Sequence, residues 1–245
     1  MEIYEHHIDP PDLFDSSYYT GKARSVFLNI ETTGLSPRTS FIFLIGIMFF
    51  SDNKYTVRSF LADSRMDERK LLETVRKEIS DLLSQSCNCR EISPDDYHYG
   101  SEKKTLDIIT FGGKTFSIRF LNERWGSYSD EDFFAEDMHD KSDSGSNASF
   151  KITDLQKNIA RLKYMFDFDS IKKYCLEEKT GFKRNHLVSG EELANIFSSS
   201  PDAKKGLIIN HNIEDMGSLL HFIRFEGYKR LIGGDYDIKS IKLIP

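Results

Sequence analysis

Runs of apolar residues separated by polar turns define the beginning of the chain. Three such runs, at residues 26–30, 41–50 and 55–61, are rich in β-branched and aromatic residues. Turn residues such as Gly, Pro, Ser, Asp and Asn separate them at 34–37 and 51–54. This pattern predicts three consecutive β-strands that form a meander.

The spacing of apolar residues then changes to that of a helix. Between residues 66 and 83 they recur three or four positions apart, with Asp63 or Ser64 available to cap the helix. A fourth strand is predicted at residues 105–111 and a second helix at residues 116–125. The first helix therefore crosses from the meander to the fourth strand.

The second half of the chain is predicted to be mainly helical. After a fifth strand at residues 150–153, apolar residues recur at helical spacing in four segments, at residues 155–164, 170–178, 191–197 and 203–225. This order of elements predicts an α/β fold, in which a central five-stranded mixed sheet is flanked by helices.

Length and composition are those of a protein with one main domain. With 245 residues, of which 39% are hydrophobic, the chain can bury the core of one large domain. We expect this domain to span residues 25–228, with a polar N-terminal arm at residues 1–24 and a C-terminal tail at residues 229–245.

Sequence features also suggest where the protein resides. The longest apolar run, residues 41–50, is about half the roughly 20 residues that span a bilayer. The first residues lack the pattern of a signal or transit peptide. Three cysteines without zinc-ligand spacing are more typical of reduced thiols than of disulfides or a structural metal. We therefore expect a cytoplasmic protein.

The net charge of −6 is concentrated in one stretch. Residues 126–149 contain seven acidic residues and one basic residue, so the rest of the chain is neutral. We expect this stretch to be an exposed, mobile insertion, because a packed core could not accommodate that charge density. Its deletion is expected to leave the melting temperature nearly unchanged. A basic protein partner is a candidate ligand for it.

Three short motifs contain the residues that point to a function. Residues 29–35 read Asn-Ile-Glu-Thr-Thr-Gly-Leu at the end of the first predicted strand, so the asparagine and the glutamate share one face. Residues 110–117 read Thr-Phe-Gly-Gly-Lys-Thr-Phe-Ser in a strand-to-helix turn. Residues 211–215 read His-Asn-Ile-Glu-Asp, whose spacing places the histidine and the final aspartate on one helix face.

In this order the motifs resemble those of the ribonuclease H-like domain of YprB type, a branch of the DEDD 3′-5′ exonuclease superfamily. That family has a strand ending in Asp-x-Glu-Thr-Thr-Gly-Leu, a turn reading Tyr-Asn-Gly-Lys-Ser-Phe-Asp and a helix with His-Asn-x-x-Asp. The similarity covers most of residues 26–223. It implies a ribonuclease H-like fold and phosphodiester cleavage assisted by two divalent ions, Mg²⁺ or Mn²⁺, about 3.5–4 Å apart.

The resemblance assigns a role to each matching residue. Glu31 and Asp215 correspond to metal-binding carboxylates, and His211 corresponds to the general base. Asn29 and Ser117 stand where the family has its two other metal-binding aspartates. The chain therefore keeps two of the four metal-binding carboxylates.

The resemblance also implies contacts with the end of a single-stranded nucleic acid, either DNA or RNA. In the family, the backbone that corresponds to Thr32, Thr33 and Gly34 lies against the 3′-terminal nucleotide. Phe116 and Asn212 are further candidate nucleic-acid-binding residues.

Electrostatics indicates what the two replacements do. The Coulomb attraction between a divalent ion and one carboxylate about 4 Å away is on the order of 8 kcal/mol at an effective dielectric of 20. An uncharged amide or hydroxyl group cannot provide this attraction. We therefore expect at most one weak metal site, formed by Glu31, Asp215 and the Asn29 carbonyl oxygen. Asp107 and Asp154 are the acids that could replace a missing ligand.

Three functions remain open from the sequence alone. The first is an exonuclease with weakened metal chemistry, and the second is a catalytically silent subunit of the same fold that binds nucleic acid or protein. The third is a one-metal nuclease acting on an unusual nucleotide. Basic residues in the helical half could contact phosphates or form a solvated face. They are Lys151, Lys157, Arg161, Lys163, Lys172, Lys173, Lys179, Lys183 and Arg184.

Overall fold

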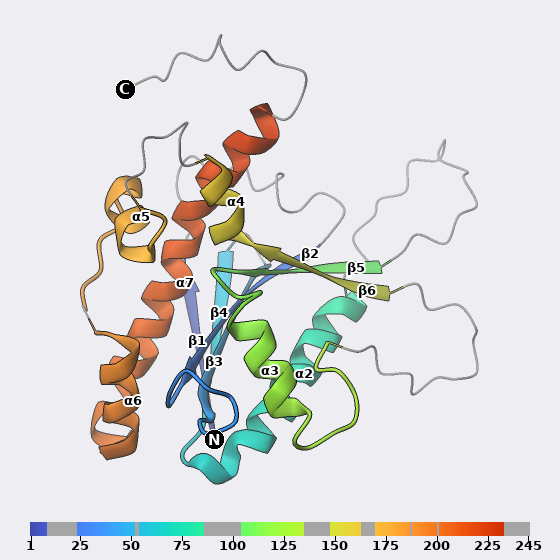
Figure 1. The fold of residues 1–245 in the computed structure, drawn as a ribbon, viewed down its shortest axis with the longest axis vertical. Coiled ribbons are helices and arrows are strands. Elements are labelled where there is room, and N and C mark those ends of the chain that lie inside the picture. The colour runs from blue at the N-terminus through green and yellow to red at the C-terminus, as the bar shows by residue number, and fades with distance from the viewer. Residues whose placement is uncertain are drawn as a thin grey trace.

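The computed structural model describes most of the chain. The described residues are 1–8, 24–51, 54–85, 104–134, 148–162, 170–186, 188–199 and 201–232. They form a mixed sheet with helices on both faces (Figure 1), as expected for a ribonuclease H-like fold.

The sheet has six strands in the order β1-β4-β3-β2-β5-β6. All five predicted strands are present, but the predicted number of strands is wrong by one. The strands are β1 (Glu2–Ile8), β2 (Arg24–Thr32), β3 (Ile42–Ser51), β4 (Lys54–Leu61), β5 (Lys104–Thr110) and β6 (Ala148–Asp154). Strands β1 to β4 pair antiparallel, whereas β2, β5 and β6 are parallel.

The additional strand, β1, lies at one edge of the sheet. It pairs antiparallel with β4 from Glu2 opposite Leu61 to Ile8 opposite Tyr55. The prediction that residues 1–24 form an arm is therefore wrong for residues 2–8, and residues 9–23 lie outside the described part. Most of this strand is exposed or half-buried, which explains why its hydrophobic pattern is weak.

The predicted helices are all present, with ends that differ by a few residues. They are the 3₁₀ helix η1 (Arg65–Asp67) and the α-helices α2 (Glu68–Gln85), α3 (Ser117–Trp125), α4 (Leu155–Leu162), α5 (Lys173–Thr180), α6 (Gly190–Ser199) and α7 (Pro201–Ile232). Helix α7 extends beyond the predicted end and includes residues 229–232, which were assigned to the tail. Among the described residues, no helix is both long and apolar enough to cross a membrane.

Alternating side chains of β2 face two different layers of helices. Val26, Leu28 and Ile30 pack in the cluster that includes α2 and α3, whereas Phe27 packs in the cluster that includes α4, α5 and α7. Because side chains alternate along a strand, Asn29 shares the face of Phe27. The strand therefore presents its polar residues toward α7.

The beginning of the acidic stretch packs against the domain, contrary to the prediction. Phe133 is buried and lies edge-on against Trp125, with ring centroids 6.0 Å apart. Tyr128 donates a hydrogen bond to Glu68 Oε2 over 2.9 Å. The aromatic residues between the acids anchor this part of the stretch, while Asp130, Glu131 and Asp132 remain exposed. Residues 135–147 lie outside the described part.

Candidate functional site

Helix α7 packs against the sheet at a glycine, Gly46 of β3. Gly46 of β3 lies opposite Asn29 of β2 and Ser59 of β4. A Cβ atom at Gly46 would overlap the side-chain amide of Asn212. Glycine at this position therefore lets α7 approach the sheet closely enough to join its residues to those of β2.

Asn212 holds α7 in this position. Its side chain is fully buried, and its Nδ2 donates a hydrogen bond to Ser59 Oγ over 2.7 Å. Its Oδ1 accepts a bond from Asn29 Nδ2 over 3.4 Å. This arrangement does not support the prediction that Asn212 binds nucleic acid, because its polar atoms are used inside the protein.

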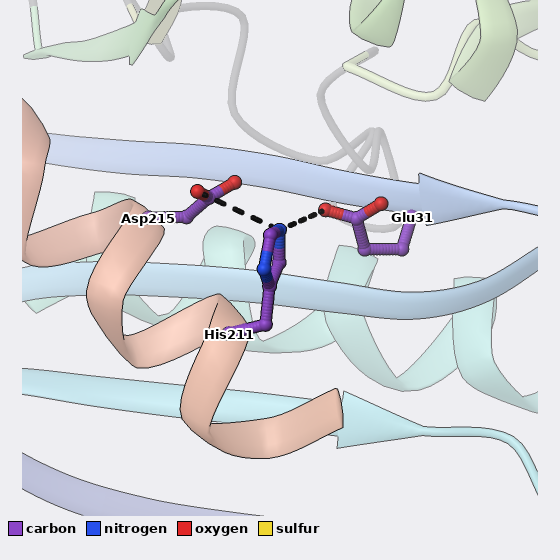
Figure 2. A group of neighbouring side chains, drawn as sticks. All are labelled: Glu31, His211 and Asp215. Atoms are coloured by element: carbon purple, nitrogen blue, oxygen red, sulfur yellow. Dashed lines mark ion pairs between the residues drawn. The ribbon is translucent and has the colours of Figure 1, made fainter. Parts of the chain in front are cut away.

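Two acids and a histidine come together at this point (Figure 2). We call Glu31, Asp215 and His211 the carboxylate cluster. One ligand atom from each lies within 4.8 Å of the others. His211 Nε2 is 3.8 Å from Glu31 Oε1 and 3.7 Å from Asp215 Oδ1. The first and third motifs, which are far apart in the sequence, therefore meet at one site.

The Asn29 amide lies between the two carboxylates. Its Nδ2 donates to Asp215 Oδ2 over 3.1 Å and to Glu31 Oε1 over 3.3 Å. An aspartate here would add a third negative charge, whereas asparagine supplies a hydrogen-bond donor. The amide therefore stabilises the two acids at close range without a metal ion.

Two basic side chains neutralise Asp215 directly. Its Oδ1 is 2.5 Å from Arg184 Nη2 and 2.7 Å from Lys173 Nζ. Glu177 of α5 holds Arg184 in turn, at 2.8 Å from Nε and 2.5 Å from Nη2. The sequence did not predict that these two cations pair with Asp215. Both lie 31 or more positions before it in the chain, and no local motif connects them to it.

Burial and neighbouring charges shift the pKa values of the carboxylate cluster in opposite directions. Burial, reinforced by repulsion from Asp215, raises the pKa of Glu31 to about 8. Burial would also raise the pKa of Asp215, but Lys173, His211 and Arg184 lower it to about 2. Near neutral pH, Asp215 is therefore ionised and Glu31 is largely protonated.

His211 lacks the partner that would orient a general base. Burial lowers its pKa, and its Nδ1 is buried without a hydrogen-bond partner among the described residues. A catalytic histidine is usually fixed by a bond to its second ring nitrogen. Its position beside the two acids fits the predicted role, but its surroundings do not provide this support.

Ser117, from the second motif, is the first residue of α3 and is buried. In the described part of the chain, no hydrogen bond or ion pair joins it to the carboxylate cluster. Parallel pairing of β2 with β5 nevertheless brings the ends of both strands to the same edge of the sheet. The second motif therefore follows a strand next to the one that bears Glu31.

Neither acid considered as a substitute ligand is placed for that role. Asp154 accepts backbone hydrogen bonds from Gly112 over 2.9 Å, Lys114 over 3.3 Å and Gln156 over 3.1 Å. It therefore fixes the turn of the second motif. Asp107 pairs with Lys151 through Oδ2 over 3.2 Å, and it lies opposite Ser25, at the other end of β2 from Glu31. The prediction that one of them could replace a missing ligand is not supported.

The turn after β2 is held by its own hydrogen bonds. Thr32 Oγ1 donates to the Gly34 carbonyl over 2.7 Å, and Thr33 Oγ1 accepts from the Phe41 amide over 3.1 Å. Leu35, at the tip of this turn, is 88% exposed. The turn, which follows Glu31 directly in the chain, thus presents one apolar side chain to solvent.

Phe116 occupies a different setting from this turn. It is half-buried and packs on Phe120, with ring centroids 5.5 Å apart. It belongs to the apolar layer beneath α3. Part of its ring remains accessible, so it stays a predicted nucleotide contact.

The donor set does not fit the pair of divalent ions that the fold family uses. Both oxygens of Asp215 already accept from Arg184, Lys173 or Asn29. At an effective dielectric of 20, a divalent ion about 4 Å from either cation would be repelled by about 8 kcal/mol. Two carboxylates also provide only two negative charges for the four positive charges of two divalent ions.

Several solved structures of exonuclease I are similar to this chain. The E. coli enzyme in complex with a dT13 oligonucleotide is 12% identical, with a TM-score of 0.41, over 76% of this chain and 42% of that one. An apo structure of exonuclease I is 13% identical, with a TM-score of 0.41, over 80% of this chain and 47% of that one. The chain thus spans less than half the length of these proteins.

Sequence comparison gives the family. No curated protein matches the chain. The family model for the RNase H superfamily matches residues 26–224, which run from β2 into α7 and include all three motifs. The predicted resemblance is confirmed at this level, and the chain belongs to the RNase H superfamily.

Proposed function

We propose that this protein is a nuclease-like domain that binds the end of a single-stranded nucleic acid and has lost most or all metal-dependent cleavage. The observation that carries the proposal is the Asn29 amide, which lies 3.1 Å from Asp215 and 3.3 Å from Glu31. It occupies the position from which the family's first aspartate would bind metal.

The expected loss of cleavage follows from the charge of the site. Two-metal hydrolysis needs ligands that stabilise both the attacking and the leaving oxygen. Here Asn29 and Ser117 contribute no charge, and Asp215 is already paired with Lys173 and Arg184. The residues that remain can position a strand but provide little to activate water.

Binding of a strand end is supported by the turn beside the carboxylate cluster. Leu35 is 88% exposed there, and an exposed apolar side chain can pack against a terminal base. Backbone groups of Thr33 and Gly34 adjoin it, and Lys114 is exposed after β5. An apolar side chain can pack on the accessible base of a single strand but not on a base that is paired and stacked inside a duplex, so these features favour a single strand.

A binding assay tests this proposal. Fluorescence anisotropy is measured with labelled single-stranded DNA, single-stranded RNA and a duplex with closed ends, in EDTA and in Mn²⁺. We expect one or both single strands to bind without a divalent ion and the closed duplex to bind more weakly. Equal binding of all three ligands, or none, would contradict the proposal.

A matched pair of variants locates the contact. Leu35→Ser should weaken strand binding severalfold, because it removes the exposed apolar side chain next to the carboxylate cluster. Met66→Ser is the control, since Met66 is 90% exposed but lies in η1. Equal effects of the two substitutions would place the strand elsewhere on the protein.

A further inference from the structure

We infer that Lys173 and Arg184 are built-in counter-ions that take the place of the divalent ions, so that the carboxylate cluster is complete without metal. The inference rests on the proposed function and deepens it. Its basis is the contact of both cations with a single oxygen, Asp215 Oδ1, at 2.7 and 2.5 Å.

This oxygen also lies beside His211 of the carboxylate cluster. Asp215 Oδ1 is the atom 3.7 Å from His211 Nε2, which in turn lies 3.8 Å from Glu31 Oε1. A metal ion held through this oxygen would have to share it with two protein cations, and the other oxygen, Oδ2, already accepts a hydrogen bond from Asn29. The cations therefore compete with a metal for the same ligand.

Arg184 is fixed in this position by a second acid. Glu177 accepts from both Nε and Nη2 of Arg184, and the side chains of both residues are at most one-tenth exposed. The guanidinium is thus held between two buried carboxylates. It cannot turn away to admit a metal without breaking its buried pair with Glu177.

Lys173 provides a more adjustable charge. Its side chain is 26% exposed, and it lies in the first turn of α5, near Glu177 of the same helix. Helix α5 therefore supplies one cation directly and holds the second. The Asn29 amide completes the set by donating to the other oxygen, Asp215 Oδ2, over 3.1 Å.

The experiment measures Mn²⁺ binding and thermal unfolding of the full chain without nucleic acid. Variants are Lys173→Met, Arg184→Met and the double substitution. The control is Arg119→Met, which also removes one positive charge but from an exposed pair with Glu123 on α3. Mn²⁺ binding is followed by calorimetry and by the loss of the free-ion paramagnetic signal.

The native chain and the control should show no saturable Mn²⁺ site at millimolar concentrations, and their melting temperatures should be equal in EDTA and Mn²⁺. The double variant should melt several degrees lower in EDTA, recover part of that loss in Mn²⁺ and gain one site. Adding Asp215→Asn to it should remove the gained site. If the double variant does not fold, the same changes in melting temperature and Mn²⁺ binding are expected of the single variant Lys173→Met.

Two results would overturn the inference. One is saturable Mn²⁺ binding by the native chain that raises its melting temperature. The other is a folded variant that lacks the cations and yet gains no Mn²⁺ site. Because these measurements contain no nucleic acid, they are independent of strand binding. A chain that excludes Mn²⁺ but binds no strand would instead refute the proposed function alone.

Discussion

The side chain at position 29 bridges the two acids of the carboxylate cluster. Asn29 donates to Asp215 over 3.1 Å and to Glu31 over 3.3 Å, and both contacts depend on its amide group. An aspartate with the same shape would accept hydrogen bonds rather than donate them. Replacing the carboxylate by an amide at position 29 therefore changes a metal ligand into a hydrogen-bond donor that stabilises the site without metal.

Restoring the missing acids should change both stability and metal binding. Without metal, Asn29→Asp should lower the free energy of unfolding by about 1–3 kcal/mol, because it leaves buried acceptors unpaired. Combining it with Ser117→Asp should tighten Mn²⁺ binding more than either single change does, since the two new carboxylates belong to one ligand set. Denaturant unfolding in EDTA and Mn²⁺ titration measure these effects. A stabilised single variant in EDTA would refute the account of Asn29.

The raised pKa of Glu31 predicts how stability depends on pH. Its pKa lies near 8 in the folded chain, above the ordinary value of 4.5, so between these limits the folded state binds more protons than the unfolded state. The contribution of Glu31 to stability should therefore fall as pH rises toward 8 and slightly above it, while that of His211, whose pKa is lowered, has the opposite sign at lower pH. Asp215, with its lowered pKa of about 2, contributes no change in this range.

Glu31→Gln tests this prediction. The variant keeps the shape of the side chain but cannot ionise, so its melting temperature should decline less than that of the native chain between pH 5 and 9, by a few degrees. Thermal unfolding at a series of pH values measures the difference. Parallel curves for the two proteins would mean that Glu31 is not the group responsible.

At the scale of elements, the contact between α7 and the sheet depends on one glycine. A side chain at Gly46 would overlap the buried Asn212 amide, so Gly46→Ala should push α7 outward and destabilise the fold by about 1–3 kcal/mol. Gly206→Ala is the control, because Gly206 is exposed in α7 with nothing near its Cβ position. That change should stabilise the helix by about 0.5–1 kcal/mol. Equal effects in urea unfolding would contradict the proposed packing.

The aromatic anchor of the acidic stretch gives a second prediction at this scale. Phe133 is 1% exposed and packs on Trp125, so Phe133→Ala should cost about 3–5 kcal/mol. Asp130→Ala, at an exposed position in the same stretch, should leave the unfolding midpoint almost unchanged. Deleting all of residues 126–149, which include Phe133, should therefore lower the unfolding midpoint. A midpoint unaffected by Phe133→Ala would contradict this packing.

For the molecule as a whole, local sequence periodicity was enough to predict most of the elements. The strands β2 to β6 and all the helices follow from apolar spacing. Spacing also placed Asn29 with Glu31 on one strand face and His211 with Asp215 on one helix face. These relations depend only on the geometry of a single element.

What the sequence could not show depends on contacts between distant segments. Strand β1 is half-exposed and pairs with β4 some 50 residues later, so its own pattern carries little signal. Lys173 and Arg184 reach Asp215 from α5 and the segment after it, outside any of the three motifs. Charge composition alone could not distinguish these two cations from other basic residues on the helical half.

The most direct test of the central claim is the fate of an end-labelled single strand in Mn²⁺ with the native protein in excess. The account predicts that the strand binds and keeps its full length over hours, and that adding EDTA changes neither its length nor its binding. Rapid shortening from the 3′ end that requires Mn²⁺ and is abolished by Glu31→Gln would contradict it, because the site would then hold catalytic metal despite Asn29 and Ser117.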